Sequence, residues 1–190
     1  MARRSNKSIA EILTPPIPTQ GSSKNGDDLL EMKISMASEG FGMTKFCELI
    51  LKDRNRLSKE NALTVSDYII AMKREVNPRL NYKKSTMKII SELSKTLGIL
   101  KKFIDMTRDD VLSYLDKCRK LENQDPLHKW IGSYNTKLTV LSRFFKWLHY
   151  PDLDDPKRRS ELSALERKPE CIMGIRKLKR KEISCYKPSG

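Results

Sequence analysis

Histidine and paired cysteine are scarce in this chain of 190 residues. It has two histidines, His128 and His149, and four cysteines, none of them in a C-x-x-C pair. The cysteine spacing fits no zinc site, and so few histidines leave little basis for imidazole catalysis. Glycine-rich phosphate-binding motifs and the H-E-x-x-H motif are also absent. We therefore expect no bound metal, no cofactor and no small-molecule substrate.

Long hydrophobic runs are also missing. No segment approaches the roughly 18 apolar residues that a membrane-spanning helix needs. The charged N-terminus, residues 1–5, is not followed by the apolar stretch of a secretory signal. Unpaired cysteines are typical of proteins in a reducing compartment. These features predict a cytoplasmic protein with no membrane partner.

Acidic residues are too few to balance the basic ones. The chain has 24 Asp and Glu against 38 Lys and Arg, which gives a net charge of +14. Such an excess indicates an anionic partner, most commonly nucleic acid, because each neutralised phosphate releases a counterion. The alternative is that the charge serves only solubility. The excess is largest within residues 81–150, which favours a binding surface on a folded region.

The composition divides the chain into four parts. Residues 1–26 are rich in proline and glycine and predict a disordered arm. Residues 27–60 predict accessory helices. Residues 64–150 have the clearest helical pattern and predict the main folded domain. Residues 151–190 are interrupted by prolines and predict an extended basic linker, with a short helix near 159–167.

Apolar spacing predicts the helices themselves. Two short helices are expected over 27–37 and from Met43, and then four longer ones. The first of the four starts at Thr64 as N-cap, with Asp67 three residues later, and stops at Asn77-Pro78. The others cover 82–97, a stretch from Thr107, and 133–149. Because no region alternates like a strand, we expect an all-α compact bundle of about four to five helices.

Three of these helices carry a family resemblance. Residues 133–148 (SYNTKLTVLSRFFKWL) resemble the last helix of the core-binding domain of tyrosine recombinases, the phage-type integrases and Xer proteins, which often reads T-I-N-R-x-L-S-A-L-R-x-F-F-x-[YW]-L. The two frequent arginines of that pattern are replaced by Thr136 and Ser142. Residues 106–115 (MTRDDVLSYL) resemble the family's I-T-x-x-D-I-x-x-[YF]-L element, and the helix opening at Lys84-Ser85-Thr86 is loosely similar to another. The nearest likeness is to archaeal integrase-like proteins.

The resemblance implies a SAM-like helical bundle that clamps double-stranded DNA. In the family, the two helices similar to those beginning near Lys83 and Ser133 enter adjacent major grooves. It therefore implies DNA binding in integration or site-specific recombination, with other recombinase protomers as further partners. Transferred by position, the DNA-contact candidates are Lys83, Lys84, Ser85, Thr86 and Lys88 on the first helix, and Tyr134, Asn135, Lys137, Thr139, Arg143 and Lys146 on the second.

The family's catalytic residues have no counterpart here. That chemistry belongs to a separate C-terminal domain with two arginines, a lysine, an H-x-x-R box and a nucleophilic tyrosine. Neither histidine of this chain is followed by such a box, and Tyr186 has no catalytic scaffold before it. We therefore expect no enzymatic activity from this chain. The remaining alternative is a helical module that binds protein or RNA.

Overall fold

The computed structural model describes residues 25–39, 43–150 and 169–179, and within these ranges the chain is helical with no strand. This confirms the all-α class, and the described residues hold six α-helices. The helices are α1 (Asn25–Ser38), α2 (Thr44–Leu51), α3 (Lys59–Glu75), α4 (Leu80–Leu97), α5 (Arg108–Asp116) and α6 (Trp130–His149). Two short 3₁₀ turns, η2 (Phe103–Asp105) and η4 (Glu170–Ile172), complete the list.

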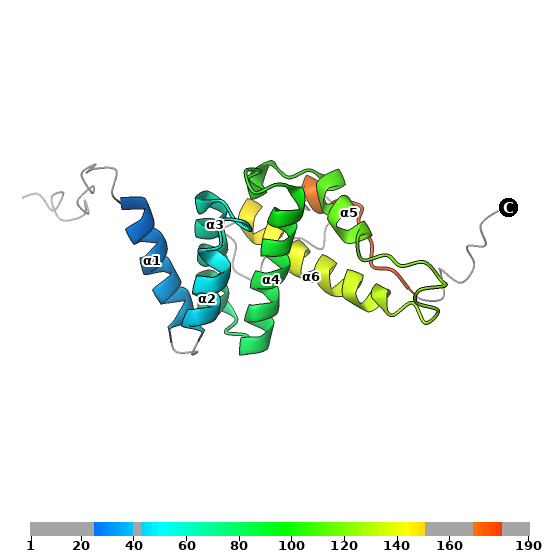
Figure 1. The fold of residues 1–190 in the computed structure, drawn as a ribbon, viewed down its shortest axis with the longest axis horizontal. Coiled ribbons are helices and arrows are strands. Elements are labelled where there is room, and N and C mark those ends of the chain that lie inside the picture. The colour runs from blue at the N-terminus through cyan, green and yellow to red at the C-terminus, as the bar shows by residue number, and fades with distance from the viewer. Residues whose placement is uncertain (1–24, 40–42, 151–168, 180–190) are drawn as a thin grey trace, which may run out of the picture.

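The helices are arranged from one end of an elongated bundle to the other (Figure 1). At one end, α1 packs against α3 and α2. In the middle, α4 crosses α6, and at the other end α5 packs beside α4 and α6. A single hydrophobic cluster extends from Leu30 of α1 to Ile172 of η4. Residues 27–60 thus contribute to the same core as residues 64–150.

Helix α3 begins earlier than its sequence pattern predicted. Its N-cap is Ser58, whose side chain accepts a hydrogen bond from the backbone N–H of Asn61 at 3.1 Å. Thr64 was expected as the N-cap, but it lies inside the helix, where its hydroxyl donates to the Glu60 carbonyl oxygen. The prediction was wrong because Ser58 offers the same cap chemistry six residues earlier. The helix therefore crosses the expected boundary between residues 60 and 64.

The ends of α4 and α5 follow from local chemistry. Helix α4 stops at Gly98, which has a φ of 101°, a conformation that side chains with a Cβ avoid. Helix α5 starts with a capping box, in which Thr107 and Asp110 exchange hydrogen bonds between side chain and backbone. These confirm the expected end at Gly98 and the expected start at Thr107. Helix α5 is short and ends at Asp116, with Lys117 as its C-cap.

Aromatic residues from α3, α6 and η2 pack together at the centre of the bundle. The Phe144 ring lies 5.3 Å from the Tyr68 ring and 5.0 Å from the Phe103 ring, both edge to face. Trp147 is half-buried and lies 5.1 Å from Tyr68. Contacts of this geometry add to the free energy gained by burying the rings. They fix α6 against α3, and so fix the surfaces that α6 presents.

The C-terminal part of the chain is not extended throughout. Residues 169–179 return to the bundle, where η4 packs against α5 and α6. Cys171 and Ile172 are buried, and Arg108 donates a hydrogen bond to the Met173 carbonyl oxygen at 3.0 Å. The prediction of an extended linker is thus wrong for these residues, because two apolar side chains find a site between α5 and α6. The expected helix near 159–167 and residues 1–24 of the expected N-terminal arm lie outside the described residues, whereas Asn25 and Gly26, also assigned to that arm, belong to α1.

No helix in the described part of the chain has the length and apolar character needed to cross a membrane.

Candidate nucleic-acid interface

Helices α4 and α6 place exposed polar and basic side chains on the outside of the bundle. On α4, Ser85 and Lys88 are exposed and Lys84 is half-buried, with its ammonium 5.7 Å from the centre of the Phe46 ring. On α6, Thr136 and Arg143 are exposed. These five residues are called the α4/α6 face below.

Two contacts join the α4 and α6 parts of this face. At one end, Arg143 donates to the Tyr82 hydroxyl at 2.6 Å, and its guanidinium lies 5.6 Å from the centre of that ring. At the other end, the Lys137 ammonium lies 3.5 Å from a Glu92 carboxylate oxygen and 4.6 Å from the centre of the Tyr114 ring. The basic sides of the two helices are therefore adjacent and are held at two points.

Three predicted contact residues are not on the surface. Lys83 and Thr86 are 0% exposed and Tyr134 is 2% exposed. The Lys83 ammonium donates to the Asn77 side chain at 3.2 Å, and burial lowers its pKa, with a smaller contribution from Lys73. Burial raises the pKa of the Tyr134 hydroxyl. Transfer by position was wrong for these three, because each side chain turns into the core.

Other predicted contact residues on α6 are engaged by residues of the chain itself. The Asn135 side-chain amide makes two hydrogen bonds of 2.9 Å with Leu178, one to its backbone N–H and one to its carbonyl oxygen. Thr139 donates to the Asn135 carbonyl oxygen, and Thr139 and Lys146 are both half-buried. Asn135 therefore holds the C-terminal segment in place. Of the predicted candidates, Lys84, Ser85, Lys88 and Arg143 remain on the α4/α6 face, with Lys137 at its edge.

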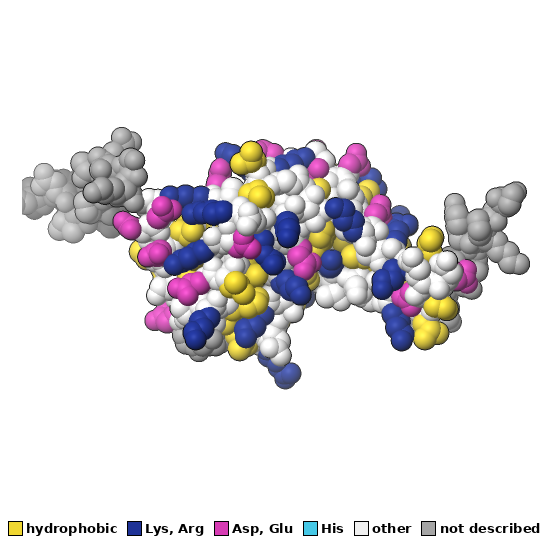
Figure 2. Space-filling model, viewed as in Figure 1, with side chains coloured by type: hydrophobic (Ala, Val, Ile, Leu, Met, Phe, Trp, Pro, Cys, Tyr) yellow, Lys and Arg dark blue, Asp and Glu magenta, His cyan; other side chains and the backbone are white. Residues whose placement is uncertain are grey.

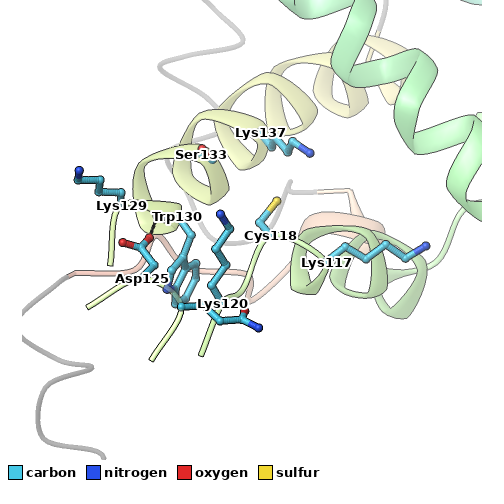
Figure 3. Close-up of a pocket in the computed structure, with 9 residues that line it drawn as sticks. Lys117, Cys118, Lys120, Asp125, Lys129, Trp130, Ser133 and Lys137 are labelled. Carbon is cyan, nitrogen blue, oxygen red and sulfur yellow. Dashed lines mark hydrogen bonds between the residues drawn. The ribbon is translucent and has the colours of Figure 1, made fainter. Parts of the chain in front are cut away.

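Sequence reasoning missed a surface hollow of about 590 Å³ between the end of α5 and the start of α6. Four lysines line it, together with Cys118, Asp125, Trp130 and Ser133 among others (Figure 3). Of the four, Lys137 was a predicted site residue, and Lys117, Lys120 and Lys129 were not. Nothing in the local sequence around Lys117 and Lys120 indicates that the following loop returns to them.

The electrostatics of the hollow are dominated by positive charge. Within the described part of the chain, Lys117, Lys120 and Lys129 form no ion pair within 4.0 Å. Asp125 is the one carboxylate in the lining. Burial alone would raise its pKa, but backbone hydrogen bonds from Trp130 and Lys129 and the charges of Lys120 and Lys129 lower it. Asp125 is thus ionised and serves to cap α6, with its carboxylate 2.9 Å from the Trp130 backbone nitrogen.

The opposite end of the bundle has a different charge pattern. There, Lys52 pairs with Glu31, and Arg54 and Lys59 both pair with Asp27. In Figure 2, acidic and basic side chains accordingly lie next to each other around α1. The basic residues named at the α1 end have carboxylate partners, whereas Lys117, Lys120 and Lys129 of the hollow have none among the described residues.

Other chemistry is little represented among the described residues. They contain no group of three or more His, Cys, Asp and Glu side chains that is placed to hold a metal ion. Burial raises the pKa of the Cys47 and Cys171 thiols to about 11, so both remain protonated at neutral pH. The exposed groups that come together are ammonium, guanidinium, hydroxyl and amide groups, which bind anionic partners.

No family model, no curated protein and no solved structure matches the chain.

Proposed function

We propose that the chain binds double-stranded DNA through the α4/α6 face. The observation that carries this proposal is the pair of bridges, Arg143 to Tyr82 and Lys137 to Glu92, which keep the basic sides of two crossing helices next to each other. A helix fits the major groove of DNA, and two helices held at a fixed angle can follow its surface together. The aromatic contacts of Phe144 hold α6 against α3 and η2.

The residue types on the face suit contact with a duplex. Lys84, Lys88 and Arg143 bind phosphates, which gives affinity without sequence preference. Ser85 and Thr136 can donate to or accept from either phosphates or base edges. The face therefore has the components for strong, salt-dependent binding and few for direct base readout. Sequence preference would then depend largely on DNA shape.

A place in DNA integration or recombination rests on the resemblance to recombinase core-binding domains. Under this proposal the chain supplies DNA binding, and strand cleavage belongs to a catalytic domain or a partner protomer. The two departures from the family pattern, Thr136 and Ser142, lie on α6 beside Arg143. The proposal thus places the phosphate contacts of α6 on Arg143 instead of on the family's arginines.

The test compares two variants that each lose three positive charges. The face variant is Lys84→Gln/Lys88→Gln/Arg143→Gln, and the control variant is Lys52→Gln/Arg54→Gln/Lys59→Gln at the α1 end, where exposed ion pairs contribute little to stability. Binding to a labelled duplex is measured at several salt concentrations, after circular dichroism confirms that both variants fold. We expect the face variant to lose about 100-fold in affinity or more near 0.1 M salt, with a salt slope shallower by about 0.9 per lost contact.

The control variant separates local contact from overall charge. If both variants lose affinity equally, the binding depends on net charge and the α4/α6 face is wrong. If the wild-type chain binds structured RNA and not duplex DNA at the same salt, the proposed partner is wrong.

A further inference from the structure

We propose that the hollow between α5 and α6 is a second binding site for a phosphate backbone, separate from the α4/α6 face. This inference rests on the proposed function, because it assigns the hollow to the same nucleic acid. The lining lysines come from three places in the sequence: the end of α5 and the loop after it, the residue before α6, and the third turn of α6. Only the fold brings them together, as Figure 3 shows.

The arrangement of the lysines favours a chain of phosphates over one small anion. In Figure 3 the four side chains spread around the hollow instead of converging on a point: Lys117 and Lys137 point to one side, and Lys129 points to the other. A single phosphate ion cannot reach ammonium groups that diverge in this way. A backbone with phosphates spaced along it can, and it would replace the carboxylate partners that three of these lysines lack within the described residues.

A buried polar group also lies in the wall of the hollow. Trp130 lines the hollow and is 7% exposed, and its indole N–H has no hydrogen-bond acceptor among the described residues. A buried donor without an acceptor costs free energy. Most native structures satisfy such groups with protein or bound water.

The hollow is also placed to continue the α4/α6 face. Lys137 lines the hollow and at the same time contacts Glu92 of α4 at the edge of that face. The lining includes one carboxylate, Asp125, which is engaged with the α6 backbone. A strand that leaves the α4/α6 face past Lys137 therefore meets positive charge before it leaves the protein.

Cys118 makes the proposal testable with the full wild-type chain. Its thiol is half-buried and lies in the lining of the hollow, whereas Cys47 and Cys171 are buried. The rate of alkylation at Cys118 is measured by mass spectrometry, residue by residue, without ligand, with a DNA duplex, and with linear inorganic polyphosphate, which has spaced phosphates but no bases or grooves. Inorganic phosphate at equal ionic strength is the control for a single anion.

We expect the duplex and polyphosphate each to slow alkylation of Cys118 at least ten-fold, and inorganic phosphate to leave it unchanged. The variant Lys117→Gln/Lys120→Gln/Lys129→Gln should lose this protection and show a shallower salt slope for duplex binding, while the control variant at Lys52, Arg54 and Lys59 keeps both. Circular dichroism shows whether the variants fold. The measurement of Cys118 protection in the wild-type chain does not depend on the folding of any variant.

The outcomes separate this inference from the proposed function. If polyphosphate protects Cys118 but no duplex binds, the proposed function fails and the hollow remains a polyphosphate site. If the duplex binds through the α4/α6 face while Cys118 reacts as fast as it does without ligand, the proposal that the hollow binds a phosphate backbone is wrong and the proposed function stands. If inorganic phosphate protects as well as polyphosphate, the hollow holds a single anion and the proposed backbone site is wrong.

Discussion

The side-chain amide of Asn135 and the backbone of Leu178 form a reciprocal pair of hydrogen bonds, each 2.9 Å long. The two residues are 43 positions apart, and the pair fixes the segment after η4 along α6. An asparagine that resembled a DNA contact by its place in a helix thus serves to close the fold. The Asn135–Leu178 contact also covers part of α6, and so it limits the surface of that helix that is open to DNA.

Replacing Asn135 with alanine should release this segment. Two partly buried hydrogen bonds are lost, so we expect the free energy of unfolding to fall by about 2 kcal/mol. Hydrogen exchange at the Leu178 amide should become much faster, while Thr136→Ala on the exposed side of the same helix leaves it unchanged. Slow exchange of Leu178 in the Asn135→Ala chain would show that the amide does not hold the segment.

Lys83→Met tests the finding that Lys83 is a core residue. Because the pKa of Lys83 is lowered in the folded state, the unfolded chain binds more protons between that value and 10.5, and the wild-type chain gains stability as pH rises through this window. The methionine variant lacks this gain. We expect urea unfolding between pH 7 and pH 10.5 to show the wild-type curve rising relative to that of the variant.

Duplex binding by the Lys83→Met chain gives an independent check. The buried ammonium does not reach a partner, so affinity at fixed salt should stay within about two-fold of wild type. Lys88→Gln removes an exposed lysine from the same helix. A loss of duplex affinity as large as that of Lys88→Gln would show that Lys83 contacts the DNA.

Thr86→Val should stabilise the protein. The Thr86 hydroxyl is buried and has no hydrogen-bond partner among the described residues, and valine has nearly the same shape. Removing an unsatisfied polar group should raise the free energy of unfolding by about 1 kcal/mol in a chemical denaturation curve. Unchanged duplex affinity is expected as well, and a destabilised variant would indicate that the hydroxyl has a partner in solution.

The Asp110 carboxylate should link stability to acid pH. Burial raises its pKa, but hydrogen bonds from Lys101 and Thr107 outweigh this and lower the pKa below 3.8 in the folded state. Its contribution is therefore present above pH 3.8 and is lost as pH falls through the folded-state value. In urea unfolding from pH 7 to pH 2.5, the difference between wild type and Asp110→Asn should shrink in that acid range. A constant difference would contradict the assignment.

The sequence predicted the elements better than their surfaces. Apolar spacing located the helices, and proline, glycine and the Thr107 capping box marked several ends, because these signals act within a few residues. Ser58 and Thr64 offered equivalent caps, and local chemistry alone did not choose between them. The choice depends on how far Leu57 and Ala62 extend the apolar face into the shared core, where both are fully buried.

The site predictions were wrong where they followed the family resemblance instead of the apolar spacing of the helices. Thr86 lies four residues before the buried Ile90, and Tyr134 lies four residues before the buried Leu138, so the helical period places both on inner faces, as the structure shows. Lys83 lies four residues before the buried Met87, so its place on the inner face was also readable. The Asn135–Leu178 pair and the lysine hollow were not readable, because they join segments that meet only after the chain has folded.

Chemical-shift mapping of the isotope-labelled chain with an unlabelled DNA duplex tests the central claim most directly. The account predicts that the largest changes at moderate salt fall on Lys84, Ser85, Lys88, Thr136 and Arg143, and that the amides around the ion pairs of α1 stay unchanged. Changes centred on α1 and α2, or spread evenly over all exposed lysines, would contradict it.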